Sequence, residues 1–240
     1  MNSQLPIVED TTIPPDCQTF PPTLKLAWEM PAGIHANLKV GGWGAGGWRP
    51  RVAGVPAVCV FCSSSLRIDE RYLALAAEVG TAIAERGWTV VSGAGSISMM
   101  GALGRSARAA GGHTIGVIPD ALVAREVADH DSDEFIVTRD MRQRKGIMDE
   151  RSNAFLALPG GIGTLEELVE AWTARSLNMH MKPVVILDPW GDFVLLRQMV
   201  DTWRDRGFVS AGAADHVHWA TEVSGALDAI GEAFTADSSR

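Results

Sequence analysis

The chain has 240 residues, of which 46% are hydrophobic and 21% are charged, and its formal net charge is −8. This length and composition suffice for one sizeable core, whereas the negative charge argues against a broad nucleic-acid-binding surface, which needs clustered Lys and Arg. No apolar run is long enough to predict a membrane span, and the first residues lack the basic and apolar segments of a secretory signal, so we expect a cytoplasmic location.

Residues 1–54 are predicted to form an extension that is largely disordered or loosely docked. The first fifty residues carry seven of the twelve prolines, and a Gly-Gly-Trp unit occurs twice, at Gly41–Trp43 and Gly46–Trp48. Such a composition resists both helix and strand. We expect residues 55–236 to form a single domain.

From Pro56 onward, apolar runs alternate with amphipathic segments of ten or more residues. The predicted strands cover residues 58–62, 89–92, 114–118, 135–137, 154–158, 184–187 and 217–220, and the predicted helices cover 70–86, 99–110, 141–151, 164–177, 193–206 and 222–234. This alternation requires crossover connections and a mostly parallel sheet. The predicted fold class is α/β: a Rossmann-like, doubly wound sheet with helices on both faces.

Cys59 and Cys62 have the spacing of a redox Cys-x-x-Cys motif. They lie inside an apolar run instead of at a helix start, and strand alternation points them to opposite faces of the sheet. We therefore expect them to be buried small hydrophobic residues.

In doubly wound sheets, ligands bind beyond the carboxyl ends of the strands. The loop after the first strand, Ser63–Ser65, is either a polar turn or a set of hydroxyl donors to a ligand. The loop after the second strand, Gly93–Ser96, has small residues where backbone could approach a phosphate. It matches neither the dinucleotide-binding G-x-G-x-x-G motif nor a P-loop.

The loop after the fifth strand, Pro159–Thr164, is a glycine-rich turn that leads into a helix. Unpaired N–H groups at a helix start can bind a phosphate. Thr164 and Glu167 also have the spacing of a capping box, which predicts a helix that starts at Thr164. The cap alone would explain these two residues, but it would not explain three glycines directly before it.

A polar cluster, Asp140–Lys145, begins the predicted helix 141–151. Asp140 can cap this helix, whereas Arg142, Arg144 and Lys145 oppose the helix dipole. One or two of them are therefore expected to face an anionic ligand; the alternative is a solvated basic face.

Five segments together resemble the LOG (Lonely Guy) family, which comprises cytokinin-activating phosphoribohydrolases often labelled as lysine decarboxylases. The segments are Cys59–Ser65, Gly116–Pro119, Arg125–Glu126, Met141–Lys145 and Pro159–Glu167. The likeness extends over about Pro56 to Phe234. It implies hydrolysis of the N-glycosidic bond of an N6-modified adenosine 5′-monophosphate, which releases the free base and ribose 5-phosphate without a metal or organic cofactor.

The resemblance also implies roles for individual residues. Arg144 and Glu167 would be catalytic, Glu126 would bind substrate, and the turn from Gly161 to Thr164 would hold the phosphate. Further substrate contacts are expected from Ser63, Gly93, Gly95, Ser96, Met141, Lys145, Gly160, Gly161, Ile162, Gly163, Thr164, Leu165 and Glu166. Family members are usually dimers or larger, with the site near the subunit interface, so we expect a homodimer or a higher homo-oligomer.

The chain departs from the family pattern at three positions. Ala94 and Ser98 stand where glycine is usual, and Arg142 stands where His is common. These changes leave Arg144 and Glu167 in place but put the preferred base in doubt.

Other functions remain open at this point. A general AMP nucleosidase or a non-catalytic nucleotide-binding protein would fit the same motifs. A pyridoxal phosphate decarboxylase would need a Schiff-base lysine, and residues 55–236 contain only Lys145 and Lys182. His216 and His218 could suggest a metal site, but the sequence offers no third ligand nearby.

Overall fold

The computed structural model of the chain describes residues 54–123 and 127–238. The predicted extension lies outside the described residues except for Gly54, and so does Glu126. Within the described part of the chain, no helix is long and apolar enough to cross a membrane.

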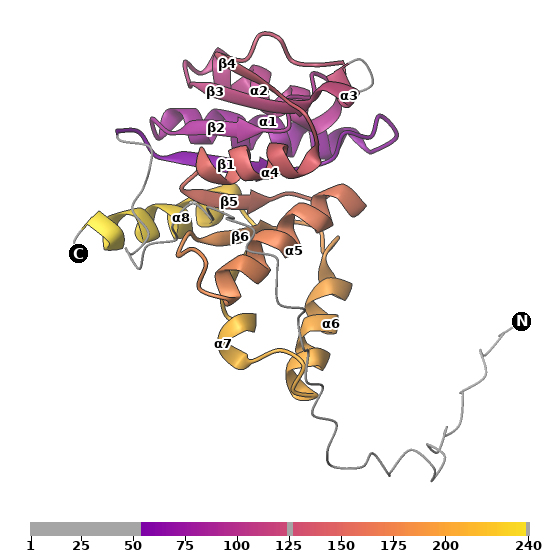
Figure 1. Cartoon of the computed structure of the whole chain (residues 1–240), viewed down its shortest axis with the longest axis vertical. Coiled ribbons are helices and arrows are strands. Elements are labelled where there is room, and N and C mark those ends of the chain that lie inside the picture. Colours follow the sequence, from indigo (N-terminus) through magenta and orange to yellow (C-terminus); the bar gives the residue numbers. More distant parts are fainter. Residues whose placement is uncertain (1–53, 124–126, 239–240) are drawn as a thin grey trace, which may run out of the picture. The chain divides into compact units, whose positions relative to one another are not determined.

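Seven parallel strands form one sheet in the order β4-β3-β2-β1-β5-β6-β7 (Figure 1). Val, Ile, Leu and Phe dominate the central strands, which suit burial on both faces. The strands are β1 Ala57–Phe61, β2 Thr89–Ser92, β3 Thr114–Pro119, β4 Glu134–Thr138, β5 Ala154–Ala157, β6 Val184–Leu187 and β7 Val217–Ala220. The expected mostly parallel α/β sheet is confirmed.

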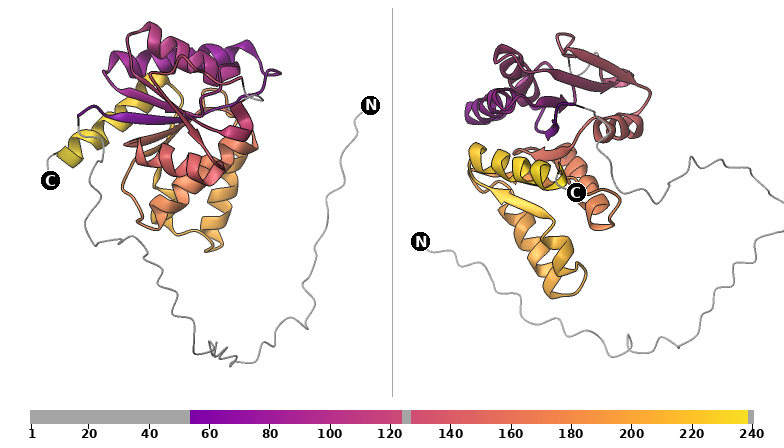
Figure 2. Two further views of the ribbon diagram at one scale, coloured as in Figure 1. Left: turned by 45° about the horizontal axis from the view of Figure 1, so that its top comes forward. Right: turned by 90° about the vertical axis from the view of Figure 1, so that its left-hand side faces the viewer.

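Helices cover both faces of the sheet (Figure 2). One face packs against α1 Glu70–Glu85, α2 Ser98–Ala109 and α8 Val223–Ser238. The other face packs against α4 Met141–Glu150, α5 Ile162–Ser176 and α6 Val194–Asp205. The sequence analysis missed two four-residue helices, α3 Asp120–Val123 and α7 Ala211–Ala214, because so short a segment shows no helical period.

Strand alternation divides the core into two clusters. Val58, Val60 and Cys62 belong to the cluster beneath α1, α2 and α8, whereas Cys59 and Phe61 belong to the cluster beneath α4, α5 and α6. Both cysteines are buried free thiols on opposite faces, which confirms the prediction for them.

The direction of winding reverses at β1. From β1 the chain proceeds outward through β2, β3 and β4 and then returns to place β5 on the other side of β1. The loops after β1 and β5 therefore diverge at the carboxyl edge of the sheet. Such a switch point is where doubly wound folds bind their ligands.

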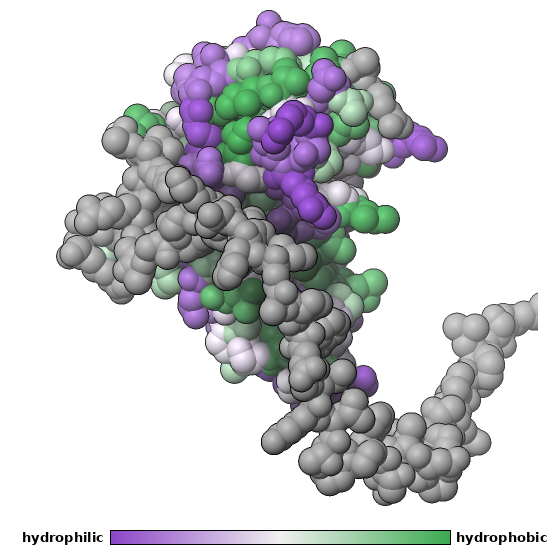
Figure 3. Space-filling model, viewed as in Figure 1, coloured by the Kyte–Doolittle hydropathy of each residue, from purple (hydrophilic) through white to green (hydrophobic). Residues whose placement is uncertain are grey.

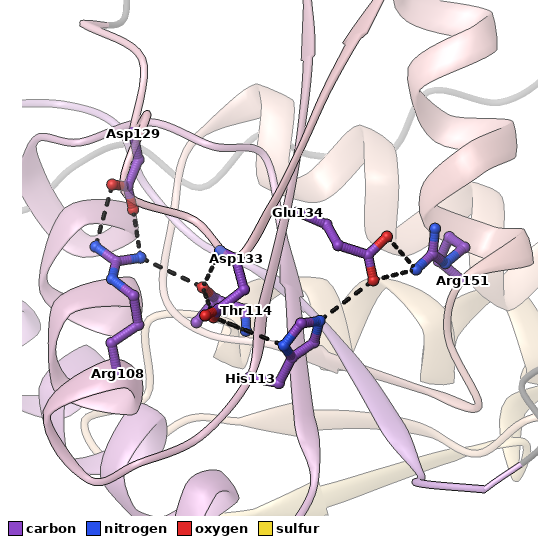
Figure 4. A network of polar contacts seen from close by, with 7 residues as sticks. All are labelled: Arg108, His113, Thr114, Asp129, Asp133, Glu134 and Arg151. Carbon is purple, nitrogen blue, oxygen red and sulfur yellow. Dashed lines mark hydrogen bonds and ion pairs between the residues drawn. The ribbon is translucent and has the colours of Figure 1, made fainter.

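The opposite edge of the sheet is held by a polar network around the amino ends of β3 and β4 (Figure 4). Arg108 forms two hydrogen bonds with Asp129, at 3.0 and 3.1 Å. The Thr114 amide donates to Asp133 at 2.8 Å, and Arg151 binds Glu134 at 2.6 Å. This network joins α2 and α4 to β3 and β4, and through Asp129, whose amide donates to the Ala94 carbonyl, it also reaches the loop after β2.

The Asp133 and Glu134 carboxylates should make stability depend on acid. Partial burial alone would raise the pKa of Asp133, but hydrogen bonds from Thr114 and the nearby His113 lower it below its usual value of 3.8. The hydrogen bond from Arg151 lowers the pKa of Glu134 below 4.5. Since both pKa values are depressed in the folded state, their contribution is present above about pH 4.5 and is lost as the pH falls through the folded-state values.

We expect the free energy of unfolding to fall as the pH drops below about 4.5, and to fall less steeply in Glu134→Gln. The two side chains are 42% and 39% exposed, so solvent screening limits each contribution to less than about 1 kcal/mol. Urea denaturation between pH 3 and pH 7 measures both slopes. Equal slopes in the two proteins would contradict this role for Glu134.

Candidate active site

Arg144 lies across the carboxyl ends of β2 and β3. It comes from the first turn of α4, where the Asp140 side chain caps the helix by accepting from the Gln143 amide at 2.8 Å, as the sequence predicted. Arg144 is only 4% exposed, yet its Nε donates to the Val117 carbonyl at 3.1 Å and its Nη2 donates to the Gly93 carbonyl at 3.3 Å. The α4 helix thus inserts one cation between two strand ends.

The glycine turn after β5 begins α5 earlier than predicted. The helix starts at Ile162, and Gly161 is the N-cap residue without a side-chain capping bond. Thr164 is the third helical residue and is buried, so the predicted capping box of Thr164 and Glu167 is wrong. The second and third glycines let the backbone turn into a helix two residues sooner than the Thr-x-x-Glu spacing suggested.

This earlier start changes which groups face a ligand. The N–H groups of Ile162, Gly163 and Thr164 lie in the first turn, where no preceding helical carbonyl can accept from them. An added Cβ at Gly161 or Gly163 would meet no atom within 4 Å, so the backbone is open to approach at both positions. The turn therefore has the geometry of an anion-binding helix start.

Glu167 and Arg144 act on the same buried thiol at the end of β1. Burial raises the pKa of Cys62, the charge of Glu167 raises it further, and the charge of Arg144 lowers it. The charges of the carboxylate and the guanidinium thus both reach the thiol at the end of β1. Glu167 is in the second turn of α5 and is half-buried. It therefore feels the helix dipole less than a first-turn residue would.

Lys145 and Glu166, both predicted to contact substrate, form an ion pair with each other. Lys145 forms ion pairs with Glu166 and with Glu170, one turn further along α5. Burial alone would lower the pKa of Lys145, but these two carboxylates outweigh burial and raise it. The pairs join α4 to α5 and thereby connect the helices that carry Arg144 and Glu167.

Two residues between the end of β2 and the first turn of α2 are strained. Ala94 and Ser98 have φ values of +56° and +54°, in the left-handed region. Each has a compensation: the Ala94 methyl is buried against Ile118 and Ala128, and the Ser98 hydroxyl donates to the Ser65 carbonyl at 2.6 Å. Left-handed strain of about 1–2 kcal/mol is comparable with these gains.

The same loop binds the chain that follows α3. The Ser96 amide donates to the Val127 carbonyl at 2.9 Å, the Ser96 hydroxyl donates to the same carbonyl, and Gly95 forms a bridge with Ala128. These contacts engage the predicted substrate-binding residues Gly95 and Ser96 within the protein. Ser63 likewise accepts from the Ser65 amide at 3.1 Å, as a polar turn would.

Exposed apolar side chains surround the strand ends. Ile162, at the start of α5, is 87% exposed; Leu66 after β1, Val127 after α3 and Met141 at the start of α4 are also exposed. Figure 3 shows apolar surface beside hydrophilic surface at the right-hand edge, where α5 begins. A polar centre with apolar surroundings suits a ligand or a partner that has both polar and apolar groups.

Comparison with known proteins identifies the family. A family model described as "Possible lysine decarboxylase" matches residues 100–230. A protein of Mycobacterium tuberculosis named cytokinin riboside 5′-monophosphate phosphoribohydrolase is 52% identical over 178 residues, which cover 74% of this chain and 95% of that protein. The chain belongs to the LOG family.

Other LOG family relatives agree. A protein of the same name from Mycobacterium marinum is 49% identical over 172 residues, which cover 72% of this chain and 91% of that protein. The Arabidopsis thaliana protein LOG1, also so named, is 42% identical over 156 residues, 65% of this chain and 73% of its own. Among solved structures, the molybdenum cofactor carrier protein from Chlamydomonas reinhardtii has a TM-score of 0.59 at 29% identity, covering 76% of this chain and 99% of that protein.

The structure brings most of the motifs of the LOG resemblance to one edge of the sheet. Arg144, Glu167, the α5 turn and the loops after β1 and β2 all lie at the carboxyl edge. Glu126 falls outside the described residues, so its expected role stays a prediction. Among the described residues, no group of three His, Cys, Asp or Glu could hold a metal ion. Sequence reasoning missed the Val117 carbonyl, because a backbone acceptor leaves no mark on the sequence.

Two glycines of the α5 turn should respond differently to substitution. An added Cβ at Gly160 would lie 2.2 Å from the Thr164 hydroxyl oxygen, so Gly160→Ala should lower the melting temperature. Gly163→Ala meets open space inside a helix, where alanine is favoured by up to about 1 kcal/mol. We expect Gly163→Ala to keep or raise the melting temperature while it weakens phosphate binding.

Calorimetry, with titration of inorganic phosphate, separates these outcomes. If Gly163→Ala binds phosphate as tightly as the wild type does, the α5 turn is not the phosphate site.

Proposed function

We propose that this protein hydrolyses the N-glycosidic bond of N6-modified adenosine 5′-monophosphates to give the free base and ribose 5-phosphate. The observation that carries the proposal is the convergence of Arg144, Glu167 and the open α5 turn at the switch point. The two mycobacterial relatives named for this activity, at 52% and 49% identity, support it.

In this proposal the α5 turn holds the 5′-phosphate. The N–H groups of Ile162, Gly163 and Thr164 point out of the helix start, and the dipole favours an anion there. Fixing the phosphate at one end of the ribose determines where C1′ lies at the other end. Phosphate binding thereby contributes to the orientation of the scissile bond.

Glu167 would stabilise the ribosyl cation. Cleavage of a C1′–N bond passes through an oxocarbenium-like state, as in sugar hydrolysis, and a fixed carboxylate beside C1′ lowers the energy of that state. An ionised carboxylate is too weak a base to deprotonate water fully at pH 7. Its role is therefore electrostatic stabilisation and the orientation of the attacking water.

Arg144 would act as a fixed cation and hydrogen-bond donor. A guanidinium stays protonated at physiological pH and does not readily release a proton. Hydrogen bonds to the Val117 and Gly93 carbonyls restrict the orientation of the Arg144 side chain. Arg144 can therefore bind the phosphate, the base or Glu167 without first being ordered. Preorganisation of this kind makes electrostatic catalysis effective.

The same reasoning extends to assembly and location. We propose a homodimer or a higher homo-oligomer, because a second copy would cover exposed Ile162 and Met141 beside the catalytic groups. The cytoplasmic location and the division into residues 1–54 and 55–236 are also proposed, on the sequence pattern alone. No cofactor is needed for the reaction as written.

The description "Possible lysine decarboxylase" does not fit the lysines. A Schiff-base lysine needs a lowered pKa, so that its amine is neutral. Lys145 has a raised pKa between Glu166 and Glu170, and Lys182 is buried with its ammonium group on Asp149 at 2.7 Å. These are the two lysines within the described residues.

A non-catalytic carrier of a nucleotide-like ligand is the second candidate. The Chlamydomonas reinhardtii structures named as molybdenum cofactor carriers share the fold at 29% identity. Such a protein would use the α5 turn without hydrolysis.

Glu167→Gln should separate enzyme from carrier. We expect the wild type to release base and ribose 5-phosphate from isopentenyladenosine 5′-monophosphate, and the variant to lose about 10²–10⁴-fold in kcat/KM, because a neutral amide cannot stabilise the ribosyl cation. Glu85→Gln, an exposed carboxylate on α1, is the control and should keep activity near wild type. Chromatography of free base measures all three, with adenosine 5′-monophosphate as the second substrate.

Binding of either nucleotide without cleavage by the wild type would favour the carrier. Release of CO₂ from lysine would contradict the hydrolase proposal.

A further inference from the structure

Gly93 lies against the guanidinium of Arg144. Its carbonyl accepts from Nη2 at 3.3 Å, and a Cβ added to Gly93 would lie 1.8 Å from the same Nη2 and 3.1 Å from the central guanidinium carbon. The next neighbour, the Met100 sulfur, would be 3.2 Å away. A side chain at position 93 therefore cannot coexist with Arg144 as the protein holds it.

We propose that Gly93 is a positioning residue for Arg144. The absence of a side chain at position 93 leaves space for the Arg144 guanidinium; it is not there to let a phosphate approach the backbone. The inference rests on the proposed function, in which Arg144 is catalytic. Gly93 is buried, and the atom nearest to its missing Cβ belongs to Arg144. A glycine kept open for a phosphate would instead face free space, as Gly161 and Gly163 do.

The peptide group that joins Gly93 to Ala94 is held from both sides. Its N–H, on Ala94, donates to the Ser92 hydroxyl at 3.4 Å, and a planar trans peptide then directs the Gly93 carbonyl to the opposite side, toward Arg144. Ala94 itself is 1% exposed, and its carbonyl accepts from the Asp129 amide at 2.8 Å. The backbone conformation that directs the Gly93 carbonyl toward Arg144 therefore includes the left-handed φ of Ala94.

Two strand ends together fix the plane of the guanidinium. Nε binds the Val117 carbonyl of β3, Nη2 binds the carbonyl directly after β2, and Nη1 lies 3.7 Å from the Met141 sulfur. These contacts engage three of the five N–H groups of an arginine. The other two, one on each terminal nitrogen, are those we assign to substrate. Lysine cannot reproduce this fork.

A double-mutant cycle tests the inference with Gly93→Ala, Arg144→Ala and the double variant. In the wild-type background Gly93→Ala should lower the melting temperature by several degrees and reduce kcat about 10²-fold, with a smaller change in KM. In the Arg144→Ala background the added methyl finds the space that Nη2 occupied, so the same substitution should change neither the melting temperature nor the residual turnover. Non-additivity of this kind identifies groups that act through each other.

Gly146→Ala is the matched control. Gly146 lies two residues after Arg144 on α4, and an added Cβ there meets no atom within 4 Å. It should leave kcat unchanged. If Gly93→Ala does not fold while the double variant does, the steric conflict with Arg144 is confirmed directly.

Equal losses of melting temperature from Gly93→Ala in both backgrounds would overturn the proposal, as would wild-type kcat in the single variant. The melting temperatures do not depend on any substrate. If the melting temperatures are non-additive but the protein cleaves no nucleotide, the hydrolase proposal is refuted and the Gly93–Arg144 coupling remains.

Discussion

The burial of Arg144 at the ends of two parallel strands is the constraint on which the rest of the site depends. A buried guanidinium is costly unless its N–H groups are bonded, and here the bonds come from backbone carbonyls at Val117 and Gly93. Those acceptors lie side by side because Ser92, the last residue of β2, pairs with Gly116 of β3, and each acceptor belongs to the next residue. The sheet thus supplies the acceptors for the Arg144 guanidinium, and the Asp140 cap fixes the start of the helix that carries it.

The other half of the site depends on the reversal of winding at β1. Because β5 returns to the opposite side of β1, the start of α5 lies across the switch point from the strands that hold Arg144. Lys145, with Glu166 and Glu170, joins α4 to α5, so the helices that carry the cation and the carboxylate are held together. The polar network around β3 and β4 binds α2 and α4 to the sheet.

Most strands and helices could be predicted from the sequence, because the residue patterns that indicate them lie within a few consecutive positions. Apolar runs such as Ala154–Leu158 and the helical periods identified every strand and each long helix, and Asp140 was recognisable as a cap. The capping box at Thr164 was wrong, because two helix starts two residues apart satisfy the same glycine-rich pattern. The fit of Gly93 to Arg144 could not be predicted, since it joins residues fifty-one positions apart through a backbone carbonyl and a missing Cβ.

A crystal structure of Glu167→Gln with adenosine 5′-monophosphate bound would test the proposed site most directly. The account predicts phosphate oxygens within hydrogen-bond distance of the Ile162, Gly163 and Thr164 amides, C1′ beside residue 167, and Arg144 still bound to the Val117 and Gly93 carbonyls. A phosphate bound away from the start of α5, or a ribose that contacts neither residue 167 nor Arg144, would contradict it.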